Sequence, residues 1–174
     1  MANFLQWLND SIIPSLAQVT KSGYIYLLNR ITGKPLYKII ERPVPSKSNL
    51  EGEVLSKTQP IPTFPDPFSR QSLTKNDINS FVIERERDSL IKIFTSLLKD
   101  DIFSPPSEEG TLIFPGFDGG AEWGGPALDP INNKLFINSN EMPWILTMKK
   151  VSNTDSQGMN IYNKPVSYTH LTLP

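Results

Sequence analysis

Prolines are concentrated in one stretch of this 174-residue chain, and they limit its fold more than any other feature. Residues 35–67 hold seven of them: Pro35, Pro43, Pro45, Pro60, Pro62, Pro65 and Pro67. Because each proline fixes φ and removes a backbone donor, neither a helix nor a central strand can run through this stretch. The apolar residues Ile39, Ile61 and Phe64 give it something to bury. We therefore expect an ordered, extended excursion over the surface; a disordered linker is the alternative.

Composition excludes several classes of function. The 17 basic and 18 acidic residues give a net charge of −1 and form no basic stripe, so the sequence gives no support for nucleic-acid binding. Cysteine is absent and His170 is the only histidine, which leaves almost no material for a zinc site or a Ser-His-Asp triad. No apolar run approaches the roughly 20 residues of a membrane-spanning helix. An enzyme built from this chain must use carboxylates, lysine or a bound cofactor.

Short strands joined by turns dominate the rest of the chain. Residues 16–19 and 24–28 predict a hairpin around the tight turn 21–23, because β-branched and aromatic residues flank a glycine-containing turn. Further strands are expected at residues 111–114, 135–138 and 144–148. This pattern indicates an antiparallel all-β architecture, either a sandwich or a propeller.

A helical insertion is expected at residues 74–99. Thr74 and Asp77 have the spacing of a capping box, with Asp in the place that Glu usually holds. Apolar residues at helical spacing follow, interrupted by the charged stretch 84–88, so one long helix or two short ones would fit. The apolar stripe predicts packing against the core rather than a groove for a partner.

Two turns of the chain are similar enough to suggest an internal repeat. Each follows a strand with a small polar turn, one beginning at Asn29 and ending at Gly33, the other beginning at Asp129 and ending at Asn133. Many hairpins share this pattern, so the match is weak evidence by itself.

Two features could carry chemistry. Lys21 lies where a strand meets a turn, and a solvated hairpin lysine is its ordinary interpretation. The glycine-rich run 119–125 frames Glu122 and Trp123, so a backbone could approach a ligand closely there while an indole face is presented. A tryptophan packed over a bend of the core explains the run equally well. It is not a phosphate-binding loop, since no Gly-Lys-Ser/Thr follows.

Several acidic residues fall in one region, so a pair of glycosidase carboxylates is conceivable. They are Glu108, Glu109, Asp118, Glu122 and Glu141. Nothing in their spacing selects two of them.

Several strings of the chain resemble the pyrroloquinoline quinone (PQQ)-dependent glucose and alcohol dehydrogenases, particularly the glucose-dehydrogenase-like branch. The strings occupy residues 17–26, 30–35, 41–45, 58–62, 102–107, 110–116, 119–129 and 140–144. They include Ala17-Gln18-Val19-Thr20-Lys21-Ser22-Gly23-Tyr24 and Gly119-Gly120-Ala121-Glu122-Trp123-Gly124-Gly125. The two repeated turns likewise resemble degenerate copies of the blade-closing tryptophan motif of quinoprotein propellers. The resemblance runs in one order from residue 13 to residue 148, so a chance match is not credible.

The resemblance implies a partial eight-bladed β-propeller of about two to three blades with a helical insertion, and PQQ at the propeller axis. Lys21 would contact the quinone oxygens of PQQ. Glu122 and Trp123 match the family's acidic-or-amide residue and tryptophan beside the cofactor, and Asn138 matches an asparagine near it. The resemblance assigns no catalytic residue to this chain, because the family's general-base aspartate belongs to a His-Asp-Leu-Trp-Asp-type motif expected upstream. It assigns no metal ligand either, since the ligands of the PQQ-bound calcium are expected outside the fragment.

The resemblance also divides the chain. Residues 1–15 carry no characteristic pattern, and residues 16–148 form the partial propeller with its excursion at 35–67 and its insertion at 74–99. Residues 149–164 are expected to be a linker and the truncated start of a cytochrome c domain, because residues 158–164 resemble the helix that opens such a domain; haem c would then belong to the full-length protein. Residues 165–174 resemble a translated sequencing adaptor, so we expect a non-native scar.

The resemblance implies a fragment of a periplasmic dehydrogenase that oxidises a sugar or another alcohol by hydride transfer to PQQ, with a cytochrome c or a quinone as electron acceptor. The fragment alone is expected to be inactive. A non-catalytic propeller module for binding or assembly is the alternative, and a carboxylate hydrolase is a third possibility.

Overall fold

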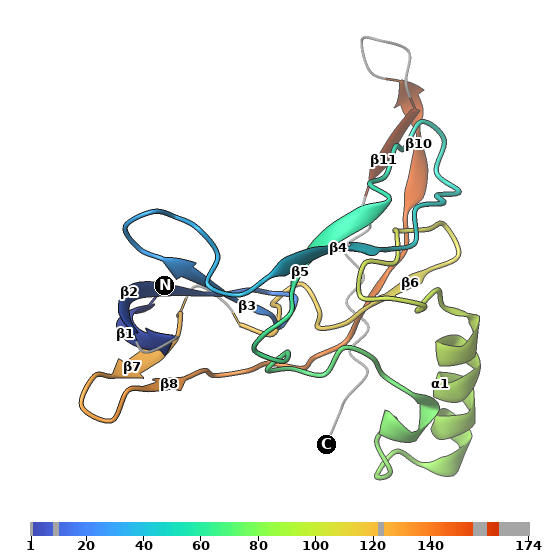
Figure 1. Ribbon diagram of the computed structural model, residues 1–174. Helices are drawn as coiled ribbons and strands as arrows, with labels where there is room; N and C mark the ends of the chain where they lie inside the picture. The colour runs from blue at the N-terminus through green and yellow to red at the C-terminus, as the bar shows by residue number, and fades with distance from the viewer. Residues whose placement is uncertain (1, 9–10, 122–123, 155–159, 164–174) are drawn as a thin grey trace.

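The computed structural model describes residues 2–8, 11–121, 124–154 and 160–163. In this part of the chain, every paired strand is antiparallel to its partner, in one three-stranded sheet and four two-stranded ones. One α-helix, α1 (Glu84–Ser96), lies at the opposite end of the molecule from the three-stranded sheet (Figure 1). The strands with a helical excursion are the architecture that the sequence predicted.

The predicted hairpin is present, and it extends further than expected. Strand β2 (Ser11–Val19) pairs with β3 (Ile25–Asn29), and the turn between them is closed by a hydrogen bond from Gly23 N–H to Thr20 O at 3.1 Å. Gly23 has a φ of +83°, which glycine adopts without steric cost. The positive φ that this turn requires therefore accounts for the glycine at position 23, on which the hairpin prediction was based.

Residues 2–8, where we expected no characteristic structure, form strand β1 (Ala2–Leu8). Strand β1 pairs with β2 along its whole length, from Ala2 opposite Ala17 to Leu8 opposite Ser11. Pro14 lies in β2 beyond the section that pairs with β3, so its missing N–H removes no bond to that strand. The three-stranded sheet thus begins before residue 16.

The proline-rich excursion forms a two-stranded ribbon. Strand β4 (Ile39–Pro43) pairs with β5 (Thr58–Pro62), and neither has a second neighbour among the described strands. Prolines are tolerated in strands of this kind because one edge of each makes no ladder. The proline-rich stretch thus carries two strands that pair only with each other among the described strands.

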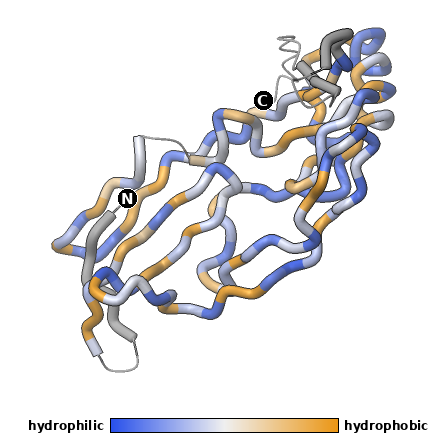
Figure 2. The backbone as a smooth tube through the Cα atoms, turned by 90° about the horizontal axis from the view of Figure 1, so that it is seen from above, coloured by the Kyte–Doolittle hydropathy of each residue, from blue (hydrophilic) through white to orange (hydrophobic). Residues whose placement is uncertain are grey.

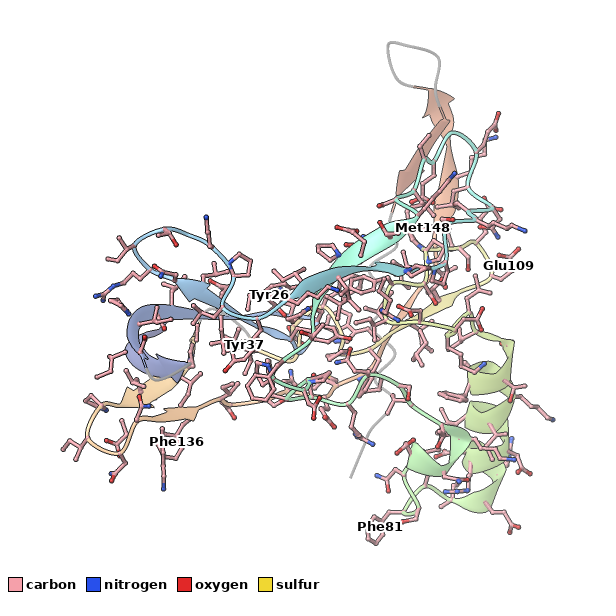
Figure 3. The ribbon with its side chains drawn as sticks, viewed as in Figure 1. Tyr26, Tyr37, Phe81, Glu109, Phe136 and Met148 are labelled. Carbon is pink, nitrogen blue, oxygen red and sulfur yellow. The ribbon has the colours of Figure 1, made fainter. Side chains whose placement is uncertain are left out.

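The insertion at residues 74–99 contains a 3₁₀ turn, η1 (Lys75–Asp77), and then α1. The capping box is confirmed: Thr74 N–H donates to Asp77 Oδ2 at 2.7 Å, and the Thr74 hydroxyl accepts from Asn76 N–H at 3.3 Å. The helical structure is shorter than expected, because α1 begins at Glu84, with the charged stretch 84–88 as its first turns, and ends at Ser96. Phe81 lies outside α1 with 88% of its surface exposed, at the tip of the insertion (Figure 3). Within the described residues, no helix has the length and apolarity to cross a membrane.

Two separate apolar clusters hold these elements together. Figure 2 shows that hydrophobic and hydrophilic stretches alternate along the chain. The first joins the insertion to strands β6 (Thr111–Ile113) and β9 (Trp144–Leu146) through the buried Phe94, Leu97 and Leu112. The second lies between the β2–β3 hairpin and strand β8 (Lys134–Phe136), which pairs with β7 (Ala127–Asp129). The apolar stripe of the helix is therefore core, as predicted.

Near the C-terminus, strand β10 (Lys149–Thr154) pairs with β11 (Asn160–Asn163). The expectation of a helix over residues 158–164 is wrong for Asn160–Asn163, because their backbone bonds to β10. Residues 155–159 and 164–174, which include the whole of the expected scar, lie outside the described residues.

The two similar turns have equivalent geometry. Asn29 Oδ1 accepts hydrogen bonds from the N–H groups two and three residues later, at 2.9 and 3.0 Å, and Asp129 Oδ1 does the same at 2.9 and 3.1 Å. The fifth residue of each turn has a positive φ, +72° at Gly33 and +51° at Asn133. The carboxylate or amide at the first position thus bonds the turn backbone in both copies, which supports the repeat.

Replacing Gly33 by alanine is expected to lower the free energy of unfolding by about 1 kcal/mol, since a Cβ at this φ is strained although the space around it is open. Asn133→Gly should raise it by a few tenths of a kcal/mol, because that change relieves the same strain. Urea denaturation of the chain measures both changes. Gly124→Ala, also in open space but without the left-handed backbone of Gly33, is the matched control; a loss as large as that at Gly33 would contradict the shared turn geometry.

Candidate active-site wall

Lys21 lies in the turn between β2 and β3, and the main chain of this turn is bonded to two segments that are distant in sequence. Three consecutive carbonyl oxygens of the turn accept hydrogen bonds from outside it. The pairs are Gly120 N–H to Lys21 O (2.7 Å), Gln71 Nε2–H to Ser22 O (2.9 Å) and Phe68 N–H to Gly23 O (2.9 Å). The turn is therefore fixed in position by contacts that neither strand of its own hairpin supplies.

The glycine-rich run approaches this turn so closely that side chains have no room. A Cβ at Gly119 would lie 2.5 Å from Cβ and Cγ of Lys21, and one at Gly120 would lie 2.8 Å from Oγ of Ser69. Gly119 also has a φ of +79°. Only glycine fits at these two positions, because the two backbones approach each other so closely. The fold thus brings together the Lys21 turn and the glycine-rich run, the two features that the sequence singled out.

The ammonium group of Lys21 is held at the same junction. Lys21 Nζ donates a hydrogen bond to the main-chain oxygen of Phe117 at 2.7 Å. The Phe117 ring meets Trp144 edge to face, with ring centroids 5.3 Å apart. A lysine bonded in this way has less conformational freedom than a solvated hairpin lysine, and its side chain remains exposed at the surface of the junction.

Two of the four residues that the resemblance selected are described. Asn138 lies beyond the end of β8 rather than in the strand, and it is exposed. Its neighbours reach the junction, since Ile137 packs against the cluster containing Ala121 and Asn140 N–H donates to Gly120 O at 2.9 Å. Glu122 and Trp123 lie outside the described residues, directly after the buried Ala121.

This arrangement fits an anionic, oxygen-rich cofactor such as PQQ. It presents a cation held beside the backbone of Gly119 and Gly120, and a held ammonium favours negative charge on a ligand oxygen. Among the described residues there is no group of three or more acidic or histidine side chains that could hold a metal ion.

A network around Arg70 fixes the loop that follows Asn138. Arg70 Nε donates to Glu141 Oε2 at 2.5 Å, and Arg70 N–H donates to Glu141 Oε1 at 2.7 Å. The guanidinium also pairs with Asp77 Oδ1 at 2.7 Å and lies over the Phe114 ring at 5.7 Å. The cap of the helical insertion and the loop beside Gly120 are therefore joined through one arginine.

These bonds change the titration of both carboxyl groups. Burial would raise the pKa of Glu141, but the N–H groups of Arg70 outweigh it and hold the pKa below its ordinary value. Bonds from the backbone and hydroxyl of Thr74, aided by Arg70, lower the pKa of Asp77. The general acid of a glycosidase needs a raised pKa, so Glu141 is unsuited to that role.

Glu109 was another candidate for the carboxylate pair. Its carboxylate accepts a hydrogen bond from the side-chain amide of Asn49 at 2.5 Å.

A second ion pair attaches the proline-rich ribbon to the body of the protein. Arg42 in β4 binds both oxygens of Asp101, at 2.6 and 3.1 Å, and its guanidinium lies 5.7 Å from the centre of the Phe103 ring. The partly buried bidentate geometry makes this pair a structural clamp.

A family model for the β-propeller domain of glucose, ethanol and alcohol dehydrogenases, described as PQQ, matches residues 5–170. The chain belongs to this PQQ-dependent dehydrogenase family. Membership confirms the resemblance and the all-β, partial-propeller class, and the match includes the second part of β1, from Leu5 onward.

Curated relatives include three kinds of dehydrogenase. The chain is 35% identical over 138 residues to a quinate/shikimate dehydrogenase (quinone) of Acinetobacter baylyi, covering 79% of this chain and 17% of the relative. It is 32% identical over 137 residues to quinoprotein glucose dehydrogenase A of Acinetobacter calcoaceticus, covering 76% and 17%. It is 31% identical over 157 residues to the glycerol dehydrogenase large subunit of Gluconobacter thailandicus, covering 88% and 21%. The chain thus spans about a fifth or less of these relatives, and no solved structure matches it.

The residues whose side chains hold the Lys21 turn and the neighbouring loop in place carry no recognisable sequence signal. Gln71 lies in a polar stretch between the prolines and the insertion, and nothing in its spacing marks it. Arg70 and Glu141 are 71 residues apart, so only the folded chain shows that they pair.

Acidification should weaken the Arg70–Glu141 link. Because the folded-state pKa of Glu141 is lowered, its contribution to stability is present above the unfolded value and is lost as pH falls through the folded value. Glu141→Gln is expected to cost about 1 kcal/mol at pH 7 and to flatten the loss of stability below about pH 4.5. Urea denaturation at a series of pH values tests this, with the exposed Glu108→Gln as control. An unchanged pH slope in Glu141→Gln would contradict the assignment.

Proposed function

We propose that this chain supplies part of the PQQ-binding wall of a periplasmic dehydrogenase that oxidises a sugar or another alcohol. One observation carries the proposal: Lys21 Nζ is held 2.7 Å from the Phe117 carbonyl, at a turn whose own carbonyl is bonded to Gly120. A cation fixed beside a glycine backbone suits the recognition of quinone oxygens. Family membership supports the same cofactor.

When bound, PQQ would supply the quinone that accepts a hydride from the substrate carbon. Lys21 would hold its ammonium against the quinone oxygens and stabilise the negative charge that gathers on them. An ammonium that is already oriented requires little rearrangement at that moment, and charge stabilisation of this kind is strongest where water is excluded.

The neighbouring residues would complete this wall. We assign Trp123 to the face of the cofactor and Glu122 and Asn138 to its polar edge, on the strength of the family motif. The bond from Asn140 N–H to Gly120 O supports this proposal, because it brings the segment after Asn138 beside the glycine-rich run. The general base and the calcium ligands would come from other parts of the propeller.

The names of the relatives support a proposal for the substrate class. Their names specify quinate or shikimate, glucose and glycerol, which all carry several hydroxyl groups. We therefore propose a polyhydroxylated alcohol or sugar as substrate. We propose a quinone as the electron acceptor, because the name of one of these relatives includes it. The alternative acceptor is a cytochrome c, with haem c in a further domain.

Equilibrium dialysis of the chain against PQQ tests the cofactor site. Lys21→Ala is expected to weaken PQQ binding roughly tenfold or more, since a charge-assisted hydrogen bond contributes about 1.5–3 kcal/mol. Lys21→Arg should retain part of the affinity. Lys34→Ala, which removes an exposed lysine directly after the first repeated turn, is the matched control. Equal affinities for the wild type and Lys21→Ala would refute the assignment.

Dye reduction tests whether this chain only binds the cofactor or can also oxidise a substrate by itself. With PQQ, Ca²⁺ and glucose, the chain alone is expected to give no measurable reduction, because it spans about 17% of several relatives and the described residues hold no metal-ligand cluster. Turnover above that of free PQQ would contradict the expectation that the base lies elsewhere. PQQ binding without any turnover in the complete dehydrogenase would instead favour a non-catalytic module.

A further inference from the structure

We infer that Gln71 is a positioning residue, whose side-chain amide sets the Lys21 turn and so directs the Lys21 ammonium toward the cofactor. The inference rests on the proposed function of Lys21. Gln71 Nε2 donates to Ser22 O at 2.9 Å and to Ser69 O at 3.2 Å, and the residue is partly buried.

The direction of the Gln71 amide is set by its surroundings. Both groups within reach of Nε2 are carbonyl oxygens, which only accept hydrogen bonds. The opposite atom, Oε1, is buried and has no partner in the described part of the chain. A rotated amide would place two acceptors against Oε1 and lose both bonds, so Gln71 acts on the turn as a donor.

The Gln71 bond differs from the other two that hold the turn. Gly120 and Phe68 donate through main-chain N–H groups, which almost any residue at those positions would provide. The bond to Ser22 O comes from a side chain, and it lies between the other two. It is therefore the one contact of the three that a substitution removes without changing the path of the backbone.

The packing around Gln71 transmits its position to Lys21. Ser69 is buried, and its Oγ would lie 2.0 Å from a Cβ at Gly23 and 2.8 Å from one at Gly120. The segment 68–71 thus fills the space between the turn and the glycine-rich run. With the Ser22 carbonyl released, the turn can move relative to Phe117 O, the main-chain oxygen that holds the Lys21 ammonium.

Two measurements on the chain test this inference, and they separate its failure from that of the proposed function. The first is amide hydrogen exchange by NMR without PQQ, read at Gly120 N–H. Gln71→Ala should speed that exchange about five- to tenfold, as expected for loss of one hydrogen bond. Gln71→Glu, which keeps the shape but lacks the donor, should do the same. Gln59→Ala in β5 is the control and should leave the exchange unchanged.

The second measurement is PQQ affinity by equilibrium dialysis, in a double-mutant cycle with Lys21→Ala. Gln71→Ala should lower the affinity about three- to tenfold with Lys21 present and should have no further effect in the Lys21→Ala background. Additive losses, or an unchanged Gly120 exchange rate, would overturn the positioning role. If exchange changes as expected but Lys21→Ala binds PQQ as tightly as the wild type, the proposed function fails and the contact between Gln71 and the turn stands.

Discussion

The hydrogen bonds to the Lys21 turn are the constraint on which the rest of the structure depends. Lys21 O and Gly23 O accept from Gly120 and Phe68, so the chain must return to this turn twice after leaving the hairpin. The proline-rich ribbon lies between β3 and the first return, and the helical insertion lies between the two returns. Both segments are therefore excursions whose ends are fixed. This explains how the 97 residues from 22 to 118 can separate Lys21 from the glycine-rich run without disturbing their contact.

This arrangement gives the family domain a cation that loses little side-chain entropy when a ligand binds. A lysine on a free hairpin would lose about 1.5–2 kcal/mol of side-chain entropy on binding a ligand. Here part of that ordering belongs to folding, because Phe117 O already accepts from Lys21 Nζ. The Arg70 network extends the same order to the loop after Asn138, since Glu141 is bonded both to the backbone and to the guanidinium of Arg70. The wall that we assign to PQQ is thus shaped before any ligand is bound.

The sequence predicts local structure well and long-range support poorly. The glycine turn at Gly23, the capping box at Thr74 and the two equivalent turns follow from short-range chemistry, so their patterns were sufficient. Strand β1 was missed because its pairing with β2, and not its own sequence, makes it a strand. Residues 158–164 resemble a helix, yet Asn160–Asn163 pair with β10. Lys21 was found through a family motif, whereas Gln71 and Arg70 act through contacts that span about 50 and 70 residues.

The central claim is that the Lys21 ammonium faces the cofactor at the glycine-rich run. The most direct measurement is NMR of the lysine side chains, labelled with ¹⁵N and ¹³C, during titration of the chain with PQQ. We expect the Nζ and Cε resonances of Lys21 to shift most among the lysines, together with the amides of Gly119 and Gly120. Saturable shifts at other lysines, with Lys21 and both glycines unchanged, would contradict it.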